Sequence, residues 1–524
     1  MLVVKDKRAL LFKLKDPAKI TTVIPGAKRV NMKGHQLIAV HHRPDEVQVL
    51  RNLGYEGIPD PMTMHYPFKA RFAAAGAQTA SANFLSLNQR AFCLNSMGMG
   101  KTITVLWTLD YMIRCGLVKR ALVVCPLSTI ERTWADEIFR NFPDMTCATL
   151  HGDAKKRLKL LDRPHDVYIV NHDGVKVIQK ELAKRPDIDL VIVDEVAVYR
   201  NATTARWKVL NDVVNKQTPR RAWGLTGAPI PNAPTDAWAQ VKLICPNNPD
   251  LPKYVSAARD ATMRQVNQFT WVPKPDALDT VHKWMQPSVR FALDDTFDLP
   301  EQVFVERHVD MSPEQNKAYR DMSAKLLAEY KGGQVAAVNA GVKANKLVQI
   351  ACGVAYQDDG SVVTFPSPAR TQLLRELIEE SEGKVIVFVP LTGVLDHLET
   401  ELKTDFEVAR IDGSTPKTDR DRIFSHFQDT DWPRVLIANP GTMSHGLTLT
   451  KATTIIWFAP INSADTYVQA NARVRRPGQT RTTVVVHIEA SGIERKMYER
   501  LAGKVLIQDA LLEIIKEVTA EIST

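Results

Sequence analysis

The sequence predicts an α/β protein with two parallel-sheet lobes, a helical linker between them and a small N-terminal accessory domain. Short apolar runs alternate with amphipathic helical segments from Arg90 onward, stop in a Pro-, Asn- and Asp-rich stretch at 246–300, and resume at Val385. Strands that alternate with helices form parallel sheets covered by helices on both faces. A chain of 524 residues is also too long for a single hydrophobic core.

The expected strands are short apolar runs bounded by helical patterns or turn signals. In the first lobe they lie at 91–94, 121–125, 167–170, 190–193 and 222–225, and in the second at 385–389, 408–411, 435–438, 454–458 and 483–488. These patterns place the accessory domain at residues 1–60, the first lobe at 61–248, the linker at 249–300 and the second lobe at 301–524, with a helical protrusion near 312–380.

One helix start can be read from the sequence directly after the second strand. Pro126 ends the strand, and Ser128 with Glu131 has the spacing of a capping box. A helix is therefore expected to begin at Ser128. The four-residue spacing of Ile130, Trp134 and Ile138 predicts that these three side chains share its buried face.

The bulk composition is that of an ordinary globular protein, with 44% hydrophobic and 24% charged residues. No apolar run approaches the roughly 20 residues that cross a bilayer. Lysines interrupt the apolar residues of the N-terminus, unlike a signal peptide. We therefore expect a soluble, cytoplasmic protein with no membrane partner. The six cysteines form no CxxC pair, which indicates reduced thiols rather than a zinc site.

The net charge of +9 is concentrated at the N-terminus. Residues 1–33 hold nine Lys and Arg against Asp6 and Asp16, an excess of +7, and the other 491 residues carry only +2. A basic segment of this kind favours contact with a polyanion such as nucleic acid. A solvated surface is the alternative, and charge alone does not choose between them.

A phosphate-binding loop is expected where Asn95-Ser-Met-Gly-Met-Gly-Lys-Thr102 follows a strand and opens a helix. Glycines allow backbone N–H groups to approach phosphates, and the helix N-terminus adds its dipole. Lys101 would neutralise the β- and γ-phosphates of ATP and Thr102 would bind Mg²⁺. The strict pattern has Gly where Asn95 stands, and the alternative is a simple strand-to-helix turn. The expected nucleotide-binding residues of the loop are Met97, Gly98, Met99, Gly100, Lys101 and Thr102.

Two acidic residues, Asp194 and Glu195, end the apolar strand at 190–193. The carboxyl end of a parallel strand is where α/β sheets place ligands. Asp194 would hold Mg²⁺ through water and Glu195 would polarise the attacking water. Taken alone, such a pair is more often a helix cap or a solvated pair.

Two arginines of the second lobe, Arg473 and Arg476, are three residues apart and would share a face of a helix. That arrangement suits the stabilisation of charge on a γ-phosphate during transfer, as arginine fingers do. A basic helix that binds phosphates or water is the alternative.

In this order, these residues resemble the Swi/Snf-like branch of the superfamily-two helicase-ATPases, and the resemblance extends from Phe68 to the end. Other segments match that family's motifs in register. They are 123–128 with Trp134 and Glu137, 194–197 with Arg200 and Asn201, 225–232, 411–415 with Arg420 and Arg422, 444–449, and Gln469 to Gln479.

The resemblance implies two RecA-like lobes and a motor that tracks along double-stranded DNA with ATP and Mg²⁺ as cofactors. Gln78 would read the adenine edge, with Phe68 or Phe72 stacking on the base. The resemblance also adds Gln469 to the catalytic residues and Gly446 to the nucleotide-binding residues. The implied DNA contacts are Ser128, Asn171, His172, Thr226, Asp412, Ser414, Ser444 and His445.

Two features depart from the family or lie outside its motor. Ala197 stands where the family often has the His that links the acid box to the motif around Thr226, so this link must use another group. The compact chain looks phage-like, and we expect it in a bacterial or phage-infected host cell, associated with the nucleoid. The expected oligomeric state is a monomer. The Ile-Pro-Gly sequence after Val23 resembles the HARP-like module of annealing helicases, and a generic β-rich cap is the alternative.

Three functions remain in competition at this point. The leading hypothesis is a DNA-stimulated ATPase that remodels branched DNA such as stalled forks. The second is an ATP-driven displacer of DNA-bound proteins such as RNA polymerase. The third, a clamp that does not hydrolyse ATP, is disfavoured by the intact Lys101, Thr102, Asp194, Glu195, Arg473 and Arg476.

Overall fold

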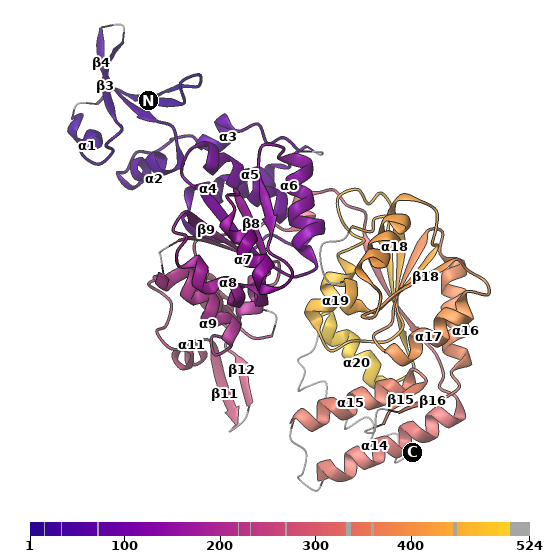
Figure 1. Cartoon of the computed structure of the whole chain (residues 1–524). Coiled ribbons are helices and arrows are strands. Elements are labelled where there is room, and N and C mark those ends of the chain that lie inside the picture. The colour runs from indigo at the N-terminus through magenta and orange to yellow at the C-terminus, as the bar shows by residue number, and fades with distance from the viewer. Residues whose placement is uncertain are drawn as a thin grey trace. The chain divides into compact units, whose positions relative to one another are not determined.

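The computed structural model describes residues 1–503, apart from residues 15, 33, 71–72, 218–219, 231, 268–269, 332–336, 358–360 and 444–447. Contacts between residues divide the chain into two compact units, Met1–Phe297 and Asp298–Thr524. Each unit is built around one parallel sheet (Figure 1). The expected alternation of strands and helices is therefore confirmed in both units.

A seven-stranded sheet forms the centre of the first unit, in the order β13-β5-β10-β9-β6-β8-β7, and every pairing in it is parallel. The five strands expected between residues 91 and 225 are all present, and the short edge strands β7 and β13 are additions to the sequence prediction. The strands are β5 (Arg90–Cys93), β6 (Arg120–Cys125), β7 (Cys147–Thr149), β8 (Val167–Asn171), β9 (Ile188–Asp194), β10 (Arg221–Leu225) and β13 (Ser288–Val289).

Two hydrophobic cores lie on opposite faces of this sheet. Successive residues of β6 alternate between them, so that Val123 belongs to one core and Leu122 to the other, as the two-residue period of a strand requires. One face is covered by α4 (Gly76–Leu87), α5 (Lys101–Arg114), η1 (Ile130–Ala135) and α6 (Asp136–Asn141). The other is covered by α7 (Ala154–Asp162), α8 (Val175–Leu182), α9 (Ala205–Asn211), α10 (Asp236–Ile244) and segments that follow α10.

The helix after β6 begins one residue later than the sequence predicts. Its N-cap residue is Thr129 rather than Ser128, and the Thr129 hydroxyl donates back to the Pro126 carbonyl at 2.9 Å instead of capping the helix. The first turn, η1, is π-helical. Ile130, Trp134 and Ile138 are all buried, as their spacing predicts.

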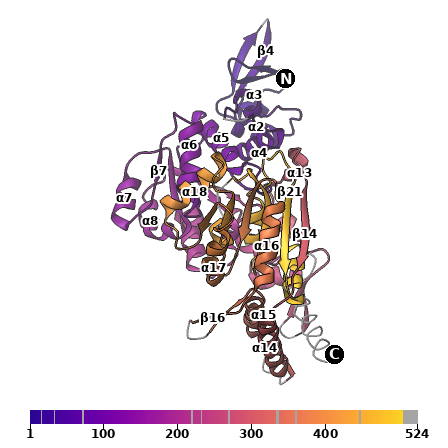
Figure 2. The same cartoon turned by 90° about the vertical axis from the view of Figure 1, so that its right-hand side faces the viewer.

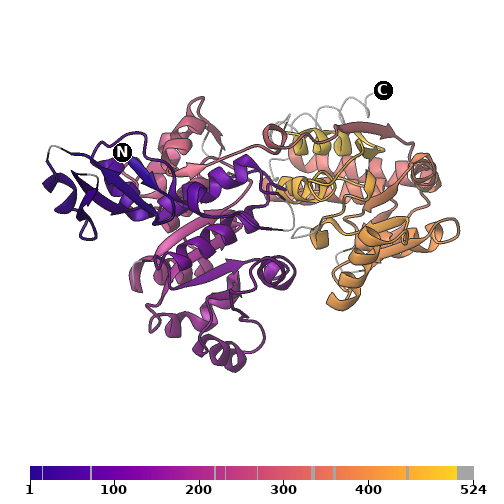
Figure 3. The ribbon, with the colours of Figure 1, turned by 90° about the horizontal axis from the view of Figure 1, so that it is seen from above.

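A small antiparallel sheet, in the order β1-β2-β4-β3, forms the N-terminal module (Figure 3). Its own core contains Leu10, Ile38 and Leu50. The module is joined to the parallel-sheet part of the first unit by Asp45, which lies 3.4 Å from Arg221, and by packing of α2 against α4. Its elements are β1 (Leu2–Val4), β2 (Ala9–Phe12), α1 (Ala18–Thr21), β3 (Lys28–Met32), β4 (His35–His41), α2 (Pro44–Asn52) and α3 (Pro61–His65).

Most of the stretch 249–300, expected as a linker, belongs to the first unit, because that unit extends to Phe297. Ala258, Val281 and Trp284 of this stretch lie in the hydrophobic core beside α10. The stretch also supplies the edge strand β13. Its other elements are α11 (Val255–Thr262), the hairpin of β11 (Met263–Asn267) and β12 (Thr270–Pro273), α12 (Ala277–Trp284) and α13 (Leu293–Thr296).

A six-stranded parallel sheet forms the centre of the second unit, in the order β14-β21-β20-β17-β19-β18. The five expected strands are confirmed, and β14 is an additional edge strand that lies beside β21 (Figure 2). The strands are β14 (Gln302–His308), β17 (Lys384–Phe388), β18 (Val408–Ile411), β19 (Val435–Ala438), β20 (Ala452–Trp457) and β21 (Thr483–Glu489).

Helices cover both faces of the second sheet as well, with Val387 in one core and Phe388 in the other. The long helices α14 (Pro313–Lys331) and α15 (Ala337–Ala351) lie side by side (Figure 1), within the stretch near 312–380 that is expected to be helical. The other elements are the hairpin of β15 (Val354–Tyr356) and β16 (Val362–Thr364), α16 (Pro368–Glu380), α17 (Thr392–Leu402), α18 (Lys417–Asp429), η5 (Pro440–Met443), α19 (Ala464–Asn471) and α20 (Gly492–Leu501). Among the helices described in both units, none has the length and apolar composition needed to cross a membrane.

Candidate functional site

The predicted nucleotide-binding segments of the first unit meet at one edge of its sheet. Strands β5, β10 and β9 are neighbours, and Leu225 at the end of β10 is paired with both Cys93 of β5 and Asp194 of β9. Because the strands are parallel, the segments that follow them emerge at the same edge. The phosphate loop, the Thr226 motif and the acid box are therefore brought together.

The phosphate loop has the backbone shape that its glycines predict. Gly98 and Gly100 have φ angles of 83° and 69°, a region that residues with a Cβ rarely adopt. Gly100 is the N-cap residue of α5, so Lys101 and Thr102 are the first two residues of that helix. The Lys101 ammonium donates to the carbonyls of Asn95 and Ser96 at 2.9 and 3.3 Å. The loop therefore curves around the charge that would face the phosphates.

Asn95, which stands where the loop pattern has Gly, is fully buried and connects three elements. Its amide nitrogen donates to the Ser81 hydroxyl of α4 at 2.8 Å. Its amide oxygen accepts the backbone N–H of Phe291 at 2.9 Å. The departure from Gly therefore has a structural role, which the loop sequence alone does not reveal.

Gln78 supports the same loop from the first turn of α4. Its amide donates to the Met99 carbonyl at 3.1 Å and accepts the Ala75 N–H at 2.9 Å. A Cβ on Gly100 would lie 2.6 Å from the Gln78 amide nitrogen, so no larger residue fits there without a shift. Phe68, one of the two candidates for base stacking, packs edge-on against Tyr66 and Trp107. The other candidate, Phe72, lies outside the described residues.

The acid box is partly buried and its backbone is strained. The Asp194 carboxylate accepts the Trp134 indole N–H at 3.0 Å and the Glu195 backbone N–H at 3.1 Å. Burial raises the pKa of Asp194, against the opposing effects of the Trp134 N–H and the nearby Lys101 charge. Glu195 has a φ of 52°, and strained backbone of this kind concentrates at functional sites.

Trp134 is a site residue that the apolar spacing predicts only as buried and that the resemblance places in a family motif without a role. Its place in the π-helical turn η1 aims the indole N–H at Asp194, and π-helical turns are frequent at functional sites. The spacing of apolar residues predicts burial but not the partner of a buried polar atom.

A physical link between the acid box and the Thr226 motif runs through α10. This helix packs against η3 (Val196–Tyr199), which carries Ala197. The fully buried Gln240 of α10 donates its amide to the Pro229 carbonyl at 2.6 Å. Ala197 offers no side-chain hydrogen bond to the Thr226 motif. The packing of α10 connects the acid box to that motif instead.

The expected DNA contacts of the first unit differ in exposure. Ser128 is exposed, and Asn171 is half-buried with its amide oxygen accepting from Arg157 at 3.1 Å. His172 and Thr226 are buried, at 8% and 1% exposure. His172 is hydrogen-bonded to Tyr199, and the Thr226 hydroxyl accepts the Ala228 N–H. His172 thus contacts the Tyr199 side chain and Thr226 supports neighbouring backbone, and the DNA contact expected of both residues stays a prediction.

The two arginines of the second unit do not lie on a helix, contrary to the sequence prediction. Helix α19 ends at Asn471, and Arg473 and Arg476 follow in a series of turns. Gln479 holds these turns against β20 by donating to the Ala452 carbonyl at 3.0 Å. Arg473 is buried, whereas Arg476 is half-buried and donates to the Ala472 carbonyl and the Thr448 hydroxyl. The pair is thus placed by tight turns and not by helical periodicity.

The remaining site residues of the second unit fall into three groups. Gln469 is buried and donates to Asp465 at 3.0 Å. Asp412 is buried too, and hydrogen bonds from Ser414 and Arg410 hold its pKa below the ordinary value. Asp412 therefore shapes its turn, whereas Ser414 is exposed, and the DNA contacts expected of both residues stay predictions. The predictions for Ser444, His445 and Gly446 lie outside the described residues.

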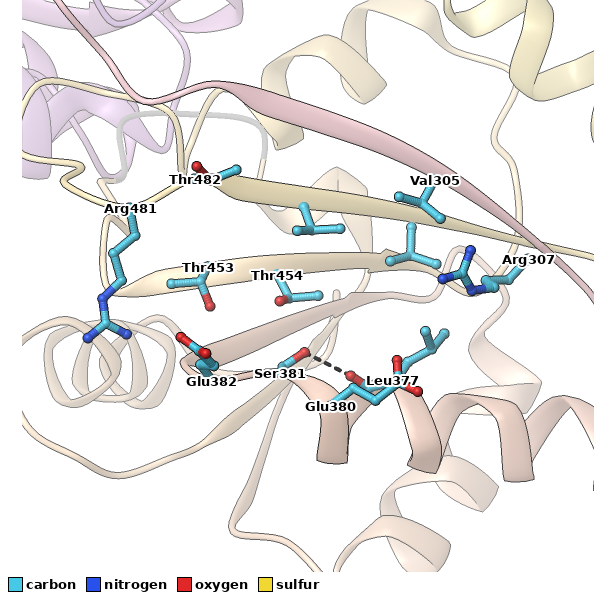
Figure 4. Close-up of a pocket in the computed structure, with 12 residues that line it drawn as sticks. Val305, Arg307, Leu377, Glu380, Ser381, Glu382, Thr453, Thr454, Arg481 and Thr482 are labelled. Atoms are coloured by element: carbon cyan, nitrogen blue, oxygen red, sulfur yellow. Dashed lines mark hydrogen bonds between the residues drawn. The ribbon is translucent and has the colours of Figure 1, made fainter.

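A cavity of about 610 Å³ lies elsewhere in the second unit, between α16 and the sheet (Figure 4). Thr453 and Thr482 mark its position near the amino ends of β20 and β21. Ligands of parallel sheets bind at the opposite, carboxyl ends. None of the predicted site residues lines this cavity, so the candidate site is not located there.

Comparisons with known proteins identify the family of this chain. The family model of the SNF2-related domain matches residues 83–351, and that of the helicase conserved C-terminal domain matches residues 369–478. A solved structure, the Sulfolobus solfataricus SWI2/SNF2 ATPase core in complex with dsDNA, is 21% identical with a TM-score of 0.39, covering 84% of this chain and 92% of that one.

Three curated relatives illustrate the range of similar proteins. The putative protein p41 of Acyrthosiphon pisum secondary endosymbiont phage 1 is 27% identical, and the match covers 80% of this chain and 94% of p41. The yeast (Saccharomyces cerevisiae) ISWI chromatin-remodeling complex ATPase ISW1 and the Arabidopsis thaliana ATP-dependent DNA helicase DDM1 are each 24% identical over 80% of this chain. The matches span only 38% of ISW1 and 58% of DDM1. Because the SNF2-related model alone covers just over half of the 524 residues, this chain belongs to the SNF2-related family of helicase-like ATPases.

Proposed function

We propose that the protein is a DNA-stimulated ATPase that moves on double-stranded DNA and remodels branched DNA, such as stalled forks, in replication, recombination or repair. The observation that carries the ATPase role is the meeting of the glycine loop and the acid box at one edge of the first sheet. The basic, exposed N-terminal module supports a nucleic-acid partner.

The loop residues Met97 to Thr102 bind the phosphates of ATP, with Lys101 neutralising the β- and γ-phosphates. Gln78 keeps the loop in shape and reads the adenine edge. Glu195 polarises the attacking water as the general base. The strained backbone of Glu195 fits this role, because strain of this kind concentrates at functional sites.

The donor set fits Mg²⁺, which prefers hard oxygen ligands and keeps several of its waters. Thr102 offers a hydroxyl at the start of α5, and Asp194 offers a carboxylate at the end of β9. When bound, the ion would neutralise charge that develops on the phosphates. Asp194 must be ionised to hold it, so ion binding and the raised pKa of this group oppose each other.

Arg473 and Arg476 of the second unit stabilise the γ-phosphate during transfer, and Gln469 and Gly446 complete that side of the nucleotide site. DNA is held mostly through its phosphates, by the exposed Ser128 and Ser414 and by Ser444 and His445. Such contacts carry little sequence information. Affinity is therefore expected to fall steeply with salt and to vary little with sequence.

The test is ATP turnover with no DNA, single strands, duplex, forks and four-way junctions at equal salt. We expect duplex to stimulate turnover and forks to stimulate it further. Equal turnover with and without every DNA would contradict the proposal. If duplex stimulates turnover and forks add nothing, the protein is a duplex translocase and the proposed role on branched DNA is wrong.

The N-terminal module is the part that we propose to recognise branches. Seven of its basic residues are described and exposed, and none of them forms an ion pair with another described residue; they are Lys5, Lys7, Arg8, Lys13, Lys19, Lys28 and Arg29. A second contact point outside the motor would raise the affinity for branched DNA through effective concentration.

Charge reversal tests this proposal better than deletion, because the module packs against α4, which supports the phosphate loop. We expect Lys5→Glu with Lys7→Glu to lower the ratio of fork-stimulated to duplex-stimulated turnover. The matched control is Lys317→Glu with Arg320→Glu, two exposed residues of α14. An unchanged ratio with uniformly weaker binding would make the module a non-specific tether.

A further inference from the structure

The phosphate loop is hydrogen-bonded to the chain that leads into the second unit. Strand β13 pairs with β5 in parallel, and this ladder continues past the end of β5. The N–H groups of Phe92, Leu94 and Ser96 donate in turn to the carbonyls of Pro287, Val289 and Phe291, at 3.0, 2.8 and 3.1 Å. The last of these bonds lies inside the loop itself.

Two side chains reinforce the ladder from opposite directions. Asn95 of the loop accepts the Phe291 N–H at 2.9 Å. Arg290 donates to the Leu94 carbonyl at 3.2 Å. Leu94, which precedes the loop, and the loop residues Asn95 and Ser96 are therefore each hydrogen-bonded to residues 289–291.

Only residues 292–297 separate the last of these bonds from the second unit, which begins at Asp298. Four of these six residues form the helical turn α13, and Phe297 donates its N–H to the Leu293 carbonyl at 3.0 Å. A connector that is itself hydrogen-bonded has little slack, because the reach of a chain falls when it is coiled.

We propose that residues 287–297 form a strap that couples movement of the second unit to the shape of the phosphate loop, with Asn95 as its positioning residue. This proposal rests on the proposed function, because the strap would be the mechanical route by which DNA binding raises ATP turnover. Coupling of this kind is reciprocal, so ATP must change DNA affinity by the factor by which DNA changes ATP affinity.

The first experiment gives the connector slack by inserting Gly-Gly between Phe297 and Asp298. We expect turnover without DNA to stay within about twofold of the original, while stimulation by duplex falls about tenfold or more, a loss of about 1.4 kcal/mol of transition-state stabilisation. The effect of the non-hydrolysable analogue adenylyl imidodiphosphate, with Mg²⁺, on duplex affinity should shrink in parallel. The matched control is the same insertion between Glu382 and Gly383, in the turn after α16, where Glu382 is exposed.

The second experiment separates the two hydrogen bonds of Asn95. Asn95→Asp keeps a side-chain oxygen that accepts the Phe291 N–H. Asn95→Leu keeps the side-chain volume but loses this hydrogen bond. Ser81→Ala removes the hydroxyl that accepts the Asn95 amide N–H, and it leaves the hydrogen bond between the Phe291 N–H and the Asn95 oxygen intact. We expect loss of the reciprocal coupling in Asn95→Leu, and retention in Asn95→Asp and Ser81→Ala. Equal behaviour of all three variants would assign Asn95 a purely structural role.

The outcomes for the strap and for the proposed function are distinct. If the original protein is stimulated by duplex and the Phe297 insertion is stimulated equally, the strap is wrong and the proposed function stands. If no DNA stimulates the original protein, the proposed function fails, and hydrogen exchange still tests the strap. Adenylyl imidodiphosphate with Mg²⁺ should then change exchange at the Phe291 amide; protection of the loop amides with no change at Phe291 would overturn the strap.

Discussion

The two sheets of this protein each bury a carboxylate in a different way. In the first unit, Asp194 is buried at the end of β9 and is hydrogen-bonded by the Trp134 indole and a backbone N–H. In the second, Glu494 of α20 is fully buried and lies 2.6 Å from Arg370 of α16. Glu494 also accepts the Ala490 N–H at 2.8 Å.

The difference separates a buried charge that serves stability from one that fits the proposed site. Arg370 and Glu494 neutralise each other, and Arg370 also donates to the carbonyls of Ala351 and Ile488. Asp194 is held by the neutral donors of Trp134 and Glu195, and burial raises its pKa. A carboxylate kept in an unfavourable site at the edge of a parallel sheet, beside a phosphate loop, fits the Mg²⁺ role that we propose for it. One architecture thus carries the proposed catalytic edge in one unit and a structural ion pair in the other.

The arginines of the second unit give the largest expected effect, because they extend the chemistry beyond the unit that holds Asp194. Arg476→Ala is expected to lower kcat with DNA by about 10³- to 10⁵-fold, as loss of an arginine finger does, with little change in ATP affinity. Arg481→Ala, which removes an exposed arginine five residues away, is the control. A variant that loses DNA binding while DNA-independent hydrolysis persists would assign Arg476 to the phosphate backbone of DNA.

Replacement of the general base comes next. Glu195→Gln should lower turnover by about 10²- to 10⁴-fold, the usual contribution of a general base, while ATP and DNA remain bound. Lys101→Ala should lower turnover as well, but by weakening ATP affinity, because this ammonium contacts the phosphates. Binding of a fluorescent ATP analogue separates the two effects, with Glu181→Gln on the surface as the control. Near-normal turnover of Glu195→Gln would refute its assignment.

The ion pair of the second unit gives a prediction for stability. Arg370→Met leaves the Glu494 charge buried without its partner and should lower the free energy of unfolding by about 3–5 kcal/mol. The double variant with Glu494→Gln should recover part of this loss, since glutamine carries no charge and still accepts the Ala490 N–H. Urea unfolding measures both. A double variant that is less stable than Arg370→Met would mean that the pair is not a charge-neutralising unit.

The smallest predicted effect distinguishes the two buried carboxylates directly. The folded-state pKa of Asp194 is raised, so between the unfolded-state and folded-state pKa the folded protein binds more protons than the unfolded chain. Stability therefore falls as the pH rises through this range. Asp194→Asn removes this cost and should raise the Tm at neutral pH by about 2–4 °C, while Mg²⁺-dependent turnover is lost. In the original protein, turnover should fall as pH drops through the raised pKa. A lower Tm for Asp194→Asn would show that its ionised form stabilises the fold.

Much of the fold could be read from the sequence because the apolar period is local. The ten expected strands are present within two residues of their predicted ends, since a buried parallel strand needs a continuous apolar run. The edge strands β7, β13 and β14 escaped prediction because they are short or exposed and have no such run. The phosphate loop and acid box could be predicted because glycines, lysine and paired acids are rare in that order after strands.

Tertiary structure alone decided the partners of the polar side chains. No sequence pattern shows that Trp134 hydrogen-bonds Asp194 or that Asn95 holds Phe291, because these contacts join residues 60 and 196 positions apart. The helical face expected for Arg473 and Arg476 is replaced by turns that Gln479 holds against β20, and burial removes Thr226, His172 and Asp412 from the surface. The sequence determines which groups the site contains, since chemistry depends on residue type and order. The fold determines what each group touches, since packing brings distant residues together.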